Sequence, residues 1–337
     1  MASAAPARRH REEGGGGVRA ILSIDGGGIR GVIPALVLAE IERRTKARIA
    51  DLFDLIAGTS TGGILAVGLT VPDAGGRPKY TAEQMVELYT EHGAEIFKKQ
   101  WWRQALAWVY GPVYSPRPLE KLLHRYAGES RLSEAVTGLL VTSWELRTRT
   151  AWFFRRSQAR AQPNADHPMR LIARATSAAP TYFPPLRMLD PVDHKELALV
   201  DGGVFANNPG VAAWVDAHEG FVRGQEVLIL SLGTGSADDP ITYRQGRIWG
   251  KLRWAQPVIG VVLDGASDTV EHELGQLLRP EQYFRFQTDI PEPNRQMDDA
   301  SPANLATLRE IAGRMIEQRS ADLDTVCARL VARAGSR

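Results

Sequence analysis

The sequence predicts an α/β fold built around a largely parallel β-sheet. Short apolar runs alternate with longer periodic stretches along the chain, which is the pattern of consecutive βα units. The 337 residues are 44% hydrophobic and 24% charged, close to globular averages, and this length is enough to bury a large core. A wholly disordered, collagenous or coiled-coil chain is therefore excluded.

The expected strands are the short apolar runs, several of which end at glycine or polar residues. They lie at residues 18–24, 52–57, 139–146, 151–157, 197–200 and 227–232.

The expected helices follow most of these strands. Residues 33–46 are apolar at Leu36, Val37 and Ile41, which is the spacing of one buried helical face. Pro209 occupies the first helical position of another helix, where its missing N–H costs nothing. The remaining expected helices are residues 62–70, 170–178, 210–218 and two amphipathic helices within residues 304–333.

No loop has the length or composition of a domain linker, so one α/β domain is expected over residues 18–236. Residues 237–337 are expected to form a helical extension packed on that domain. Residues 1–17 combine charges, small residues and glycines without an apolar stretch, so they are expected to be a flexible tail and not a signal peptide.

The net charge of +2 argues against a dedicated nucleic-acid-binding protein, which would need one strongly basic face. The single cysteine, Cys327, excludes an intramolecular disulfide and a metal site built on paired cysteines. The apolar runs are shorter than the roughly 20 residues of a membrane-spanning helix. We therefore expect a cytoplasmic protein that contacts membranes only at their surface.

Residues 25–31, Asp-Gly-Gly-Gly-Ile-Arg-Gly, lie between the first expected strand and the first helix. Consecutive glycines leave backbone N–H groups open at a helix N-terminus, which suits an anion. The loop could bind a dinucleotide phosphate, stabilise a reaction oxyanion, or be a turn without a ligand. A dinucleotide site needs an acid at the end of the second strand, where this chain has Ala57, so that alternative is disfavoured.

Residues 58–62, Gly-Thr-Ser-Thr-Gly, lie between an apolar strand and an apolar helix. This is the context of a nucleophile elbow, in which a sharp turn lifts the hydroxyl of Ser60 out of the sheet. Gly58 and Gly62 relieve the crowding, and the helix N-terminus stabilises developing negative charge. The alternative is a serine that only caps the helix.

A nucleophilic serine needs a base. Only His218 and His272 lie far enough downstream for a Ser-Asp-His order, and both fall in expected helices. Asp201 instead follows a short apolar strand and precedes Gly202 and Gly203, which suits a carboxylate at the mouth of a sheet. A desolvated carboxylate can itself activate a serine, although Asp201 could also be a turn residue or helix cap.

The three motifs, in this order, resemble those of the patatin-like phospholipase family. Residues 172–180, 183–185 and 207–209 (Asn-Asn-Pro) are also similar to the segments that flank the family's aspartate. The resemblance covers roughly residues 20–235, with no departure at the catalytic positions.

The resemblance implies a three-layer α/β/α sandwich and a lipid acyl hydrolase of phospholipase A type, without a metal or organic cofactor. By matching positions, Ser60 is the implied nucleophile of an acyl-enzyme mechanism and Asp201 the implied general base. Arg30 would hold the glycine-rich loop or meet a substrate phosphate. The implied oxyanion hole comprises the amides of Gly26, Gly27 and Gly28, and the glycines that complete the motifs are Gly31, Gly58, Gly62, Gly202 and Gly203.

Two stretches, residues 98–110 and 244–254, combine tryptophan with basic residues. This mixture suits a membrane interface, where rings lie at headgroup depth and cations meet anionic lipid. The alternative is that these rings pack in the core or in a lid. The candidate membrane-contacting residues are Trp101, Trp102, Trp249 and Trp254.

The expected substrate is membrane phospholipid or another lipid ester. Two alternatives use the same dyad: an acyltransferase or thioesterase, and a phospholipase effector that stays silent until a small ligand binds. Some bacterial patatin-like phospholipases are anti-phage effectors activated by cyclic oligonucleotides, and this chain is similar in size. No residue identifies a nucleotide pocket. A catalytically inactive binding module is disfavoured because all three motifs are intact.

Overall fold

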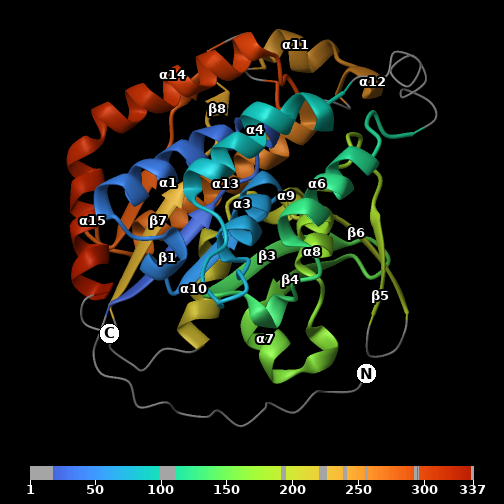
Figure 1. The fold of residues 1–337 in the computed structure, drawn as a ribbon. Helices are drawn as coiled ribbons and strands as arrows, with labels where there is room; N and C mark the ends of the chain where they lie inside the picture. Colours follow the sequence, from blue (N-terminus) through green and yellow to red (C-terminus); the bar gives the residue numbers. More distant parts are fainter. Residues whose placement is uncertain are drawn as a thin grey trace.

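A mostly parallel central sheet separates two layers of helices, which gives a three-layer α/β/α sandwich (Figure 1). The computed structural model describes residues 18–98, 111–190, 195–219, 226–237, 241–254, 257–291, 294 and 296–334. The α/β class and the largely parallel sheet expected from the sequence are confirmed.

The strands of the central sheet follow the spatial order β5-β6-β3-β2-β1-β7-β9, and β4 pairs with the free edge of β3. Strands β1 and β7, inside the sheet, are buried almost throughout because parallel strands are covered on both faces. The strands are β1 (Arg19–Ile24), β2 (Leu55–Gly58), β3 (Gly138–Glu145), β4 (Thr150–Arg155), β5 (Leu186–Leu189), β6 (Glu196–Asp201), β7 (Val227–Leu232) and β9 (Tyr283–Phe286), with β8 (Ser236–Ala237) and β10 (Asp289–Ile290) in a separate pair.

Helices cover both faces, and the alternation of side chains along a strand divides the core into two clusters. Leu22 of β1 faces the larger cluster, whereas its neighbour Ile21 faces the smaller one with Ala213 and Leu274. The helices are α1 (Val32–Thr45), α2 (Ile49–Leu52), α3 (Thr61–Thr70), α4 (Ala82–Ile96), α6 (Arg117–Ala127), α7 (Arg156–Ala161), α8 (Met169–Thr176), α9 (Gly203–Ala206), α10 (Gly210–Glu219), α11 (Tyr243–Ile248), α12 (Lys251–Trp254), α13 (Pro257–Leu277), α14 (Pro302–Gln318) and α15 (Ser320–Ala334).

Strands β2 and β6 meet end to end on one edge of β3. Residues 140–141 of β3 pair with both β2 and β4, whereas residues 143–145 pair with both β6 and β4. Since a strand has only two edges, β2 and β6 share the edge opposite β4. β2 is parallel and β6 antiparallel to β3, so their carboxyl ends, Gly58 and Asp201, come together.

The C-terminal third contributes more than the expected helices. The two helices expected within residues 304–333 are confirmed as α14 and α15, which pack along α1 (Figure 1). The sequence predicts no strand after residue 236, yet β9 extends the central sheet beside β7. The central sheet therefore includes chain from beyond the expected domain boundary.

Among the described residues, no helix combines the length and apolar character needed to cross a bilayer.

Candidate active site

Ser60 lies on a strained turn between β2 and α3. Its φ of 54° and ψ of −120° place a non-glycine residue in a sparsely populated backbone region. A Cβ on Gly58 would collide with the carbonyl of Gly62, and a Cβ on Gly62 with the carbonyl of Ile24. Both positions therefore require glycine, which is the geometry of a nucleophile elbow.

Hydrogen bonds to the backbone hold this turn from two sides. The N–H of Ser60 donates to Oγ1 of Thr176 at 2.8 Å. The hydroxyl of Thr59 donates to the carbonyl of Ala206 at 2.7 Å. Thr176 lies in the segment singled out in the sequence, but its role as the partner of Ser60 was not predicted.

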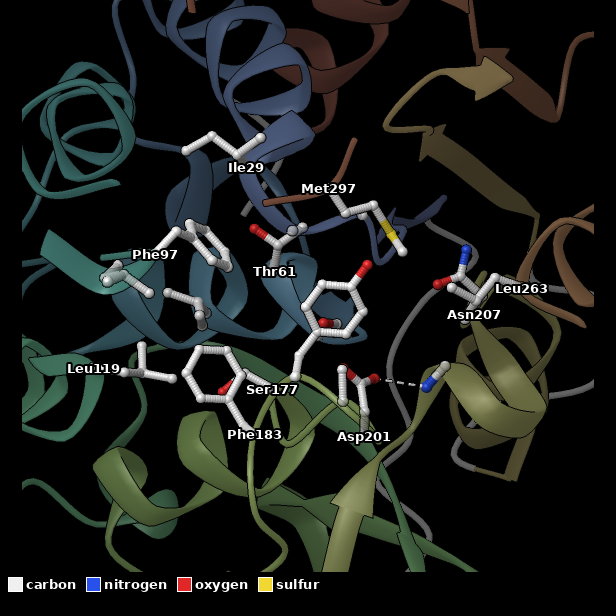
Figure 2. Close-up of a pocket in the computed structure, with 18 of the residues that line it drawn as sticks. Ile29, Thr61, Phe97, Leu119, Ser177, Phe183, Asp201, Asn207, Leu263 and Met297 are labelled. Carbon is white, nitrogen blue, oxygen red and sulfur yellow. Dashed lines mark hydrogen bonds between the residues drawn. The ribbon is translucent and has the colours of Figure 1, made fainter. Parts of the chain in front are cut away.

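Asp201 is the last residue of β6 and is 4% exposed. Its N–H donates to the carbonyl of Ala178 at 3.1 Å, which ties it to the loop after α8. The N–H of Gly203 donates to Oδ1 of Asp201 at 2.8 Å, the dashed line in Figure 2. Gly202 has no room for a side chain because a Cβ there would collide with Thr142.

The Asp201 carboxyl titrates near neutral pH. Burial raises the pKa of Asp201 to about 7, although hydrogen bonds from the Ser60 hydroxyl and the Gly203 N–H pull the pKa down. In the part of the chain that the structure describes, no salt bridge joins Asp201 to a cation. A carboxylate with this pKa is suited to take a proton from a neighbouring hydroxyl at neutral pH.

The glycine-rich loop presents two open amides beside Ser60. The N–H of Gly26 donates to the carbonyl of Asn207 at 3.0 Å, so the expectation that Gly26 supplies an oxyanion donor is wrong. The N–H groups of Gly27 and Gly28 have no partner among the described residues, and both glycines line the same pocket as Ser60. Gly28 has a φ of +59°, and a Cβ there would collide with the carbonyl of Met297.

Side chains from distant segments support the glycine-rich loop. The hydroxyl of Thr234 donates to the carbonyl of Gly26 at 2.6 Å. Arg30 is 7% exposed, and its Nε donates to the carbonyl of Gly27 at 3.3 Å. Burial lowers the pKa of Arg30, while the nearby charge of Asp264 opposes that shift. Arg30 therefore lies where it can hold the loop.

Asp25, which opens this loop, forms a buried ion pair that the sequence did not predict. Arg285 of β9 donates from Nη1 and Nη2 to the two carboxylate oxygens of Asp25, at 3.1 and 2.6 Å. Nη1 also donates to Ser231 of β7 at 2.9 Å. Burial lowers the pKa of Arg285, but the charge of Asp25 outweighs it and raises the pKa above its usual value. The C-terminal third thus anchors the loop.

An apolar pocket, partly open to solvent, lies above Ser60 and Asp201. Figure 2 shows Phe97, Leu119 and Phe183 on one side of Thr61, and Met297 and Leu263 on the other. Of the lining side chains described, only Asp201 is a carboxylic acid, and none is basic. Such a pocket suits hydrocarbon next to a few polar groups.

No histidine lines this pocket among the described residues. The ring of His218 packs on Trp214, with centroids 5.1 Å apart, and His272 is exposed on α13. In the ranges described, no cluster of three or more His, Cys, Asp or Glu could hold a metal ion.

The structure describes two of the four candidate interface tryptophans. Trp249 and Trp254 pack edge to face with centroids 5.3 Å apart, and both are half-buried. The guanidinium of Arg253 lies 5.1 Å from the Trp249 ring centre. Trp101 and Trp102 lie outside the described residues.

The chain is similar to known proteins over most of its length. The family model of patatin-like phospholipases matches residues 22–214. Patatin-like protein 1 of Arabidopsis thaliana is 31% identical over 95% of this chain and 86% of its own length. Patatin-2-Kuras 3 of Solanum tuberosum is 32% identical over 88% of this chain and 83% of its own. The crystal structure of VipD from Legionella pneumophila is similar at 13% identity, with a TM-score of 0.38 over 89% of this chain and 67% of that one.

Proposed function

This chain belongs to the patatin-like phospholipase family, and from that premise we propose that it is a serine lipid acyl hydrolase with a Ser60–Asp201 dyad. Its substrates are phospholipids or related carboxylic esters. The observation that carries the proposal is the pairing at the pocket floor: a serine on a strained turn is hydrogen-bonded to a buried carboxylate that has no cationic partner among the described residues.

Acylation follows from this geometry. Oγ of Ser60 attacks the ester carbonyl carbon while Asp201 accepts the hydroxyl proton. The negative charge that develops on the carbonyl oxygen is stabilised by the free N–H groups of Gly27 and Gly28. The tetrahedral intermediate collapses, the ester C–O bond breaks, and the leaving alkoxide takes the proton from Asp201. An acyl-Ser60 ester and a lysolipid or alcohol result.

Deacylation repeats these steps with water. Asp201 takes a proton from a water molecule, whose oxygen attacks the acyl carbonyl, and the same two amides stabilise the oxyanion. The bond between the acyl carbon and Ser60 breaks, and the proton returns to Oγ. The fatty acid leaves, and the dyad returns to its starting state.

The proposal predicts that Ser60→Ala and Asp201→Asn each lower kcat/KM by about 10³-fold or more, because each removes a member of a concerted pair. Release of p-nitrophenol from medium-chain p-nitrophenyl esters and of fatty acid from mixed phospholipid vesicles measures this loss. In the wild type, kcat/KM should rise with pH and level off above about 7, as Asp201 loses its proton.

The matched control is His272→Ala, an exposed histidine outside the pocket, which should retain full activity. Near-normal activity of Asp201→Asn would overturn the dyad. Comparison of water with alcohol acceptors separates hydrolysis from acyl transfer. Assays with and without cyclic nucleotides test the ligand-gated alternative.

A further inference from the structure

The first two turns of α13 are apolar on two neighbouring faces. Ile259 and Leu263, four residues apart, line the pocket above Ser60. Val258, Val261 and Val262 point outward and are 42%, 51% and 44% exposed. A helix that is apolar on its solvent side normally has a partner there. Further along the helix the outward face is polar, with Asp268, His272 and Glu273.

α11 lies at the periphery of the molecule (Figure 1), and α12, which follows it in the chain, contacts α13. Tyr243 is 80% exposed and Ile248 is 74% exposed, the two most exposed large apolar side chains among the described residues. Trp249, which follows Ile248 at the end of α11, packs against Trp254 at the end of α12. The exposed apolar residues here are therefore not the tryptophans that the sequence suggested.

Unpaired positive charge surrounds these side chains. Arg244, Arg247 and Arg253 are exposed, and none forms a salt bridge within the described parts of the chain. Residues 241–263 contain no Asp or Glu, whereas the rest of α13 carries four acids. In the sequence this acid-free segment is bordered by Asp238 and Asp239 on one side and by Asp264 on the other.

We propose that this surface, formed by α11, α12 and residues 257–263, docks on a membrane that contains anionic phospholipid. Tyr243, Ile248 and the three exposed valines enter the interface, and the arginines meet lipid phosphates. Because Ile259 and Leu263 belong to the same helical turns, docking places the pocket entrance at the lipid. The inference rests on the proposed function for the nature of the substrate, while docking itself needs no catalysis.

The positive charge of this surface favours an anionic membrane over a second copy of the chain as its occupant. In a two-fold symmetric contact the same patch meets itself, so unpaired arginines would face arginines. An anionic bilayer supplies both the hydrocarbon and the negative charge that the surface lacks. A lipid surface is also continuous with the apolar pocket, which a protein partner on this face would close off.

Vesicle co-sedimentation of the full-length Ser60→Ala protein tests docking without hydrolysis. We expect stronger binding to phosphatidylcholine vesicles that contain phosphatidylglycerol than to phosphatidylcholine alone, and weaker binding at high salt. Adding Tyr243→Ser and Ile248→Ser together should weaken binding to both vesicles by about tenfold or more. Adding Arg244→Glu and Arg247→Glu together should weaken binding to the anionic vesicles by about tenfold or more.

Two matched controls keep the test specific. Leu277→Ser removes another exposed apolar side chain (58%) at the far end of α13, and Arg314→Glu reverses an exposed arginine on α14. Both should bind like the parent, and thermal unfolding checks that every variant folds. Equal loss in the controls, or parental binding by the surface variants, would overturn the proposal. So would a dimer in sedimentation velocity that the Tyr243→Ser and Ile248→Ser changes dissociate.

The two proposals fail separately. If catalysis does not use Ser60, the wild type and Ser60→Ala hydrolyse esters equally, yet vesicle binding still reports on docking. If docking fails, soluble esters are still hydrolysed and only the vesicle measurements change. With Ser60 intact, the surface variants should lower hydrolysis of vesicle phospholipid more than hydrolysis of a soluble short-chain ester.

Discussion

Asp25 and Asp201 are both buried at the carboxyl ends of strands in the same sheet, but their partners differ. Asp25 is 1% exposed and receives two hydrogen bonds from the guanidinium of Arg285. Asp201 is 4% exposed and receives hydrogen bonds from a hydroxyl and a backbone N–H. One carboxylate has a counter-ion, and the other has none in the described structure.

The different partners of Asp25 and Asp201 indicate different roles for the two side chains. Burial raises the pKa of Asp25 while the charge of Arg285 opposes that shift, and the two hydrogen bonds from the guanidinium fix the start of the glycine-rich loop. A buried carboxyl without a cation holds its proton until near-neutral pH, so it can exchange protons with substrate. Burial raises the pKa of both carboxyls, so their partners distinguish them: the oxygens of Asp25 are bonded to Arg285, whereas Asp201 is bonded to Ser60 and lines the pocket.

The largest expected effect comes from breaking the Asp25 pair. Arg285→Met leaves the carboxylate of Asp25 buried without its cation, which should lower the free energy of unfolding by about 3–5 kcal/mol. Urea unfolding measures this loss. Asp25→Asn combined with Arg285→Met should be less destabilised than the two single variants summed. A loss below about 1 kcal/mol in Arg285→Met would show that the pair is not what holds the loop.

The sequence revealed Ser60 and Asp201 because each lies in a local glycine motif, and steric contacts explain those glycines. Gly58, Gly62 and Gly202 each lie too close to neighbouring atoms to accept a Cβ. Arg285 carries no such local signal. It is 260 residues from Asp25 and is one of 34 arginines in the chain, so only the tertiary fold identifies it.

The strands, like the site residues, were predicted where the local sequence carries a signal and missed where it does not. Strands β1 and β7 are buried on both faces, and their continuous apolar runs predicted them. Strands β5 and β9 were missed because they are four residues long and each contains an arginine. Gly26 was misassigned because a glycine-rich sequence does not show which amides the fold has already bonded.

A smaller change in the free energy of unfolding is expected at Asp201, where the substitution should stabilise the fold. Its folded-state pKa of about 7 lies above that of an exposed aspartate, so its stabilising contribution is present in acid and is lost as pH rises through about 7. Asp201→Asn removes this loss. At pH 8 the variant should be more stable than the wild type by up to about 4 kcal/mol, whereas near pH 4 the two should agree.

Urea unfolding at both pH values measures this difference, and Ser60→Ala is its control because it leaves the carboxyl in place. An Asp201→Asn variant that is destabilised at pH 8 would mean that the carboxylate is stabilised in the fold. The raised pKa of Asp201, on which the proposed proton transfer depends, would then be wrong.

The smallest change in stability is expected at Glu271, the second carboxylate that pairs with Arg285. Nε of Arg285 donates to Glu271 at 3.2 Å, but the side chain of Glu271 is 45% exposed. Water screens this contact and can replace it, so Glu271→Gln should lower the free energy of unfolding by less than about 1 kcal/mol. Arg285 thus pairs with one buried and one exposed carboxylate, and urea unfolding compares the two pairs. If Glu271→Gln cost as much as Arg285→Met, exposure to water would not be what separates a structural ion pair from a dispensable one.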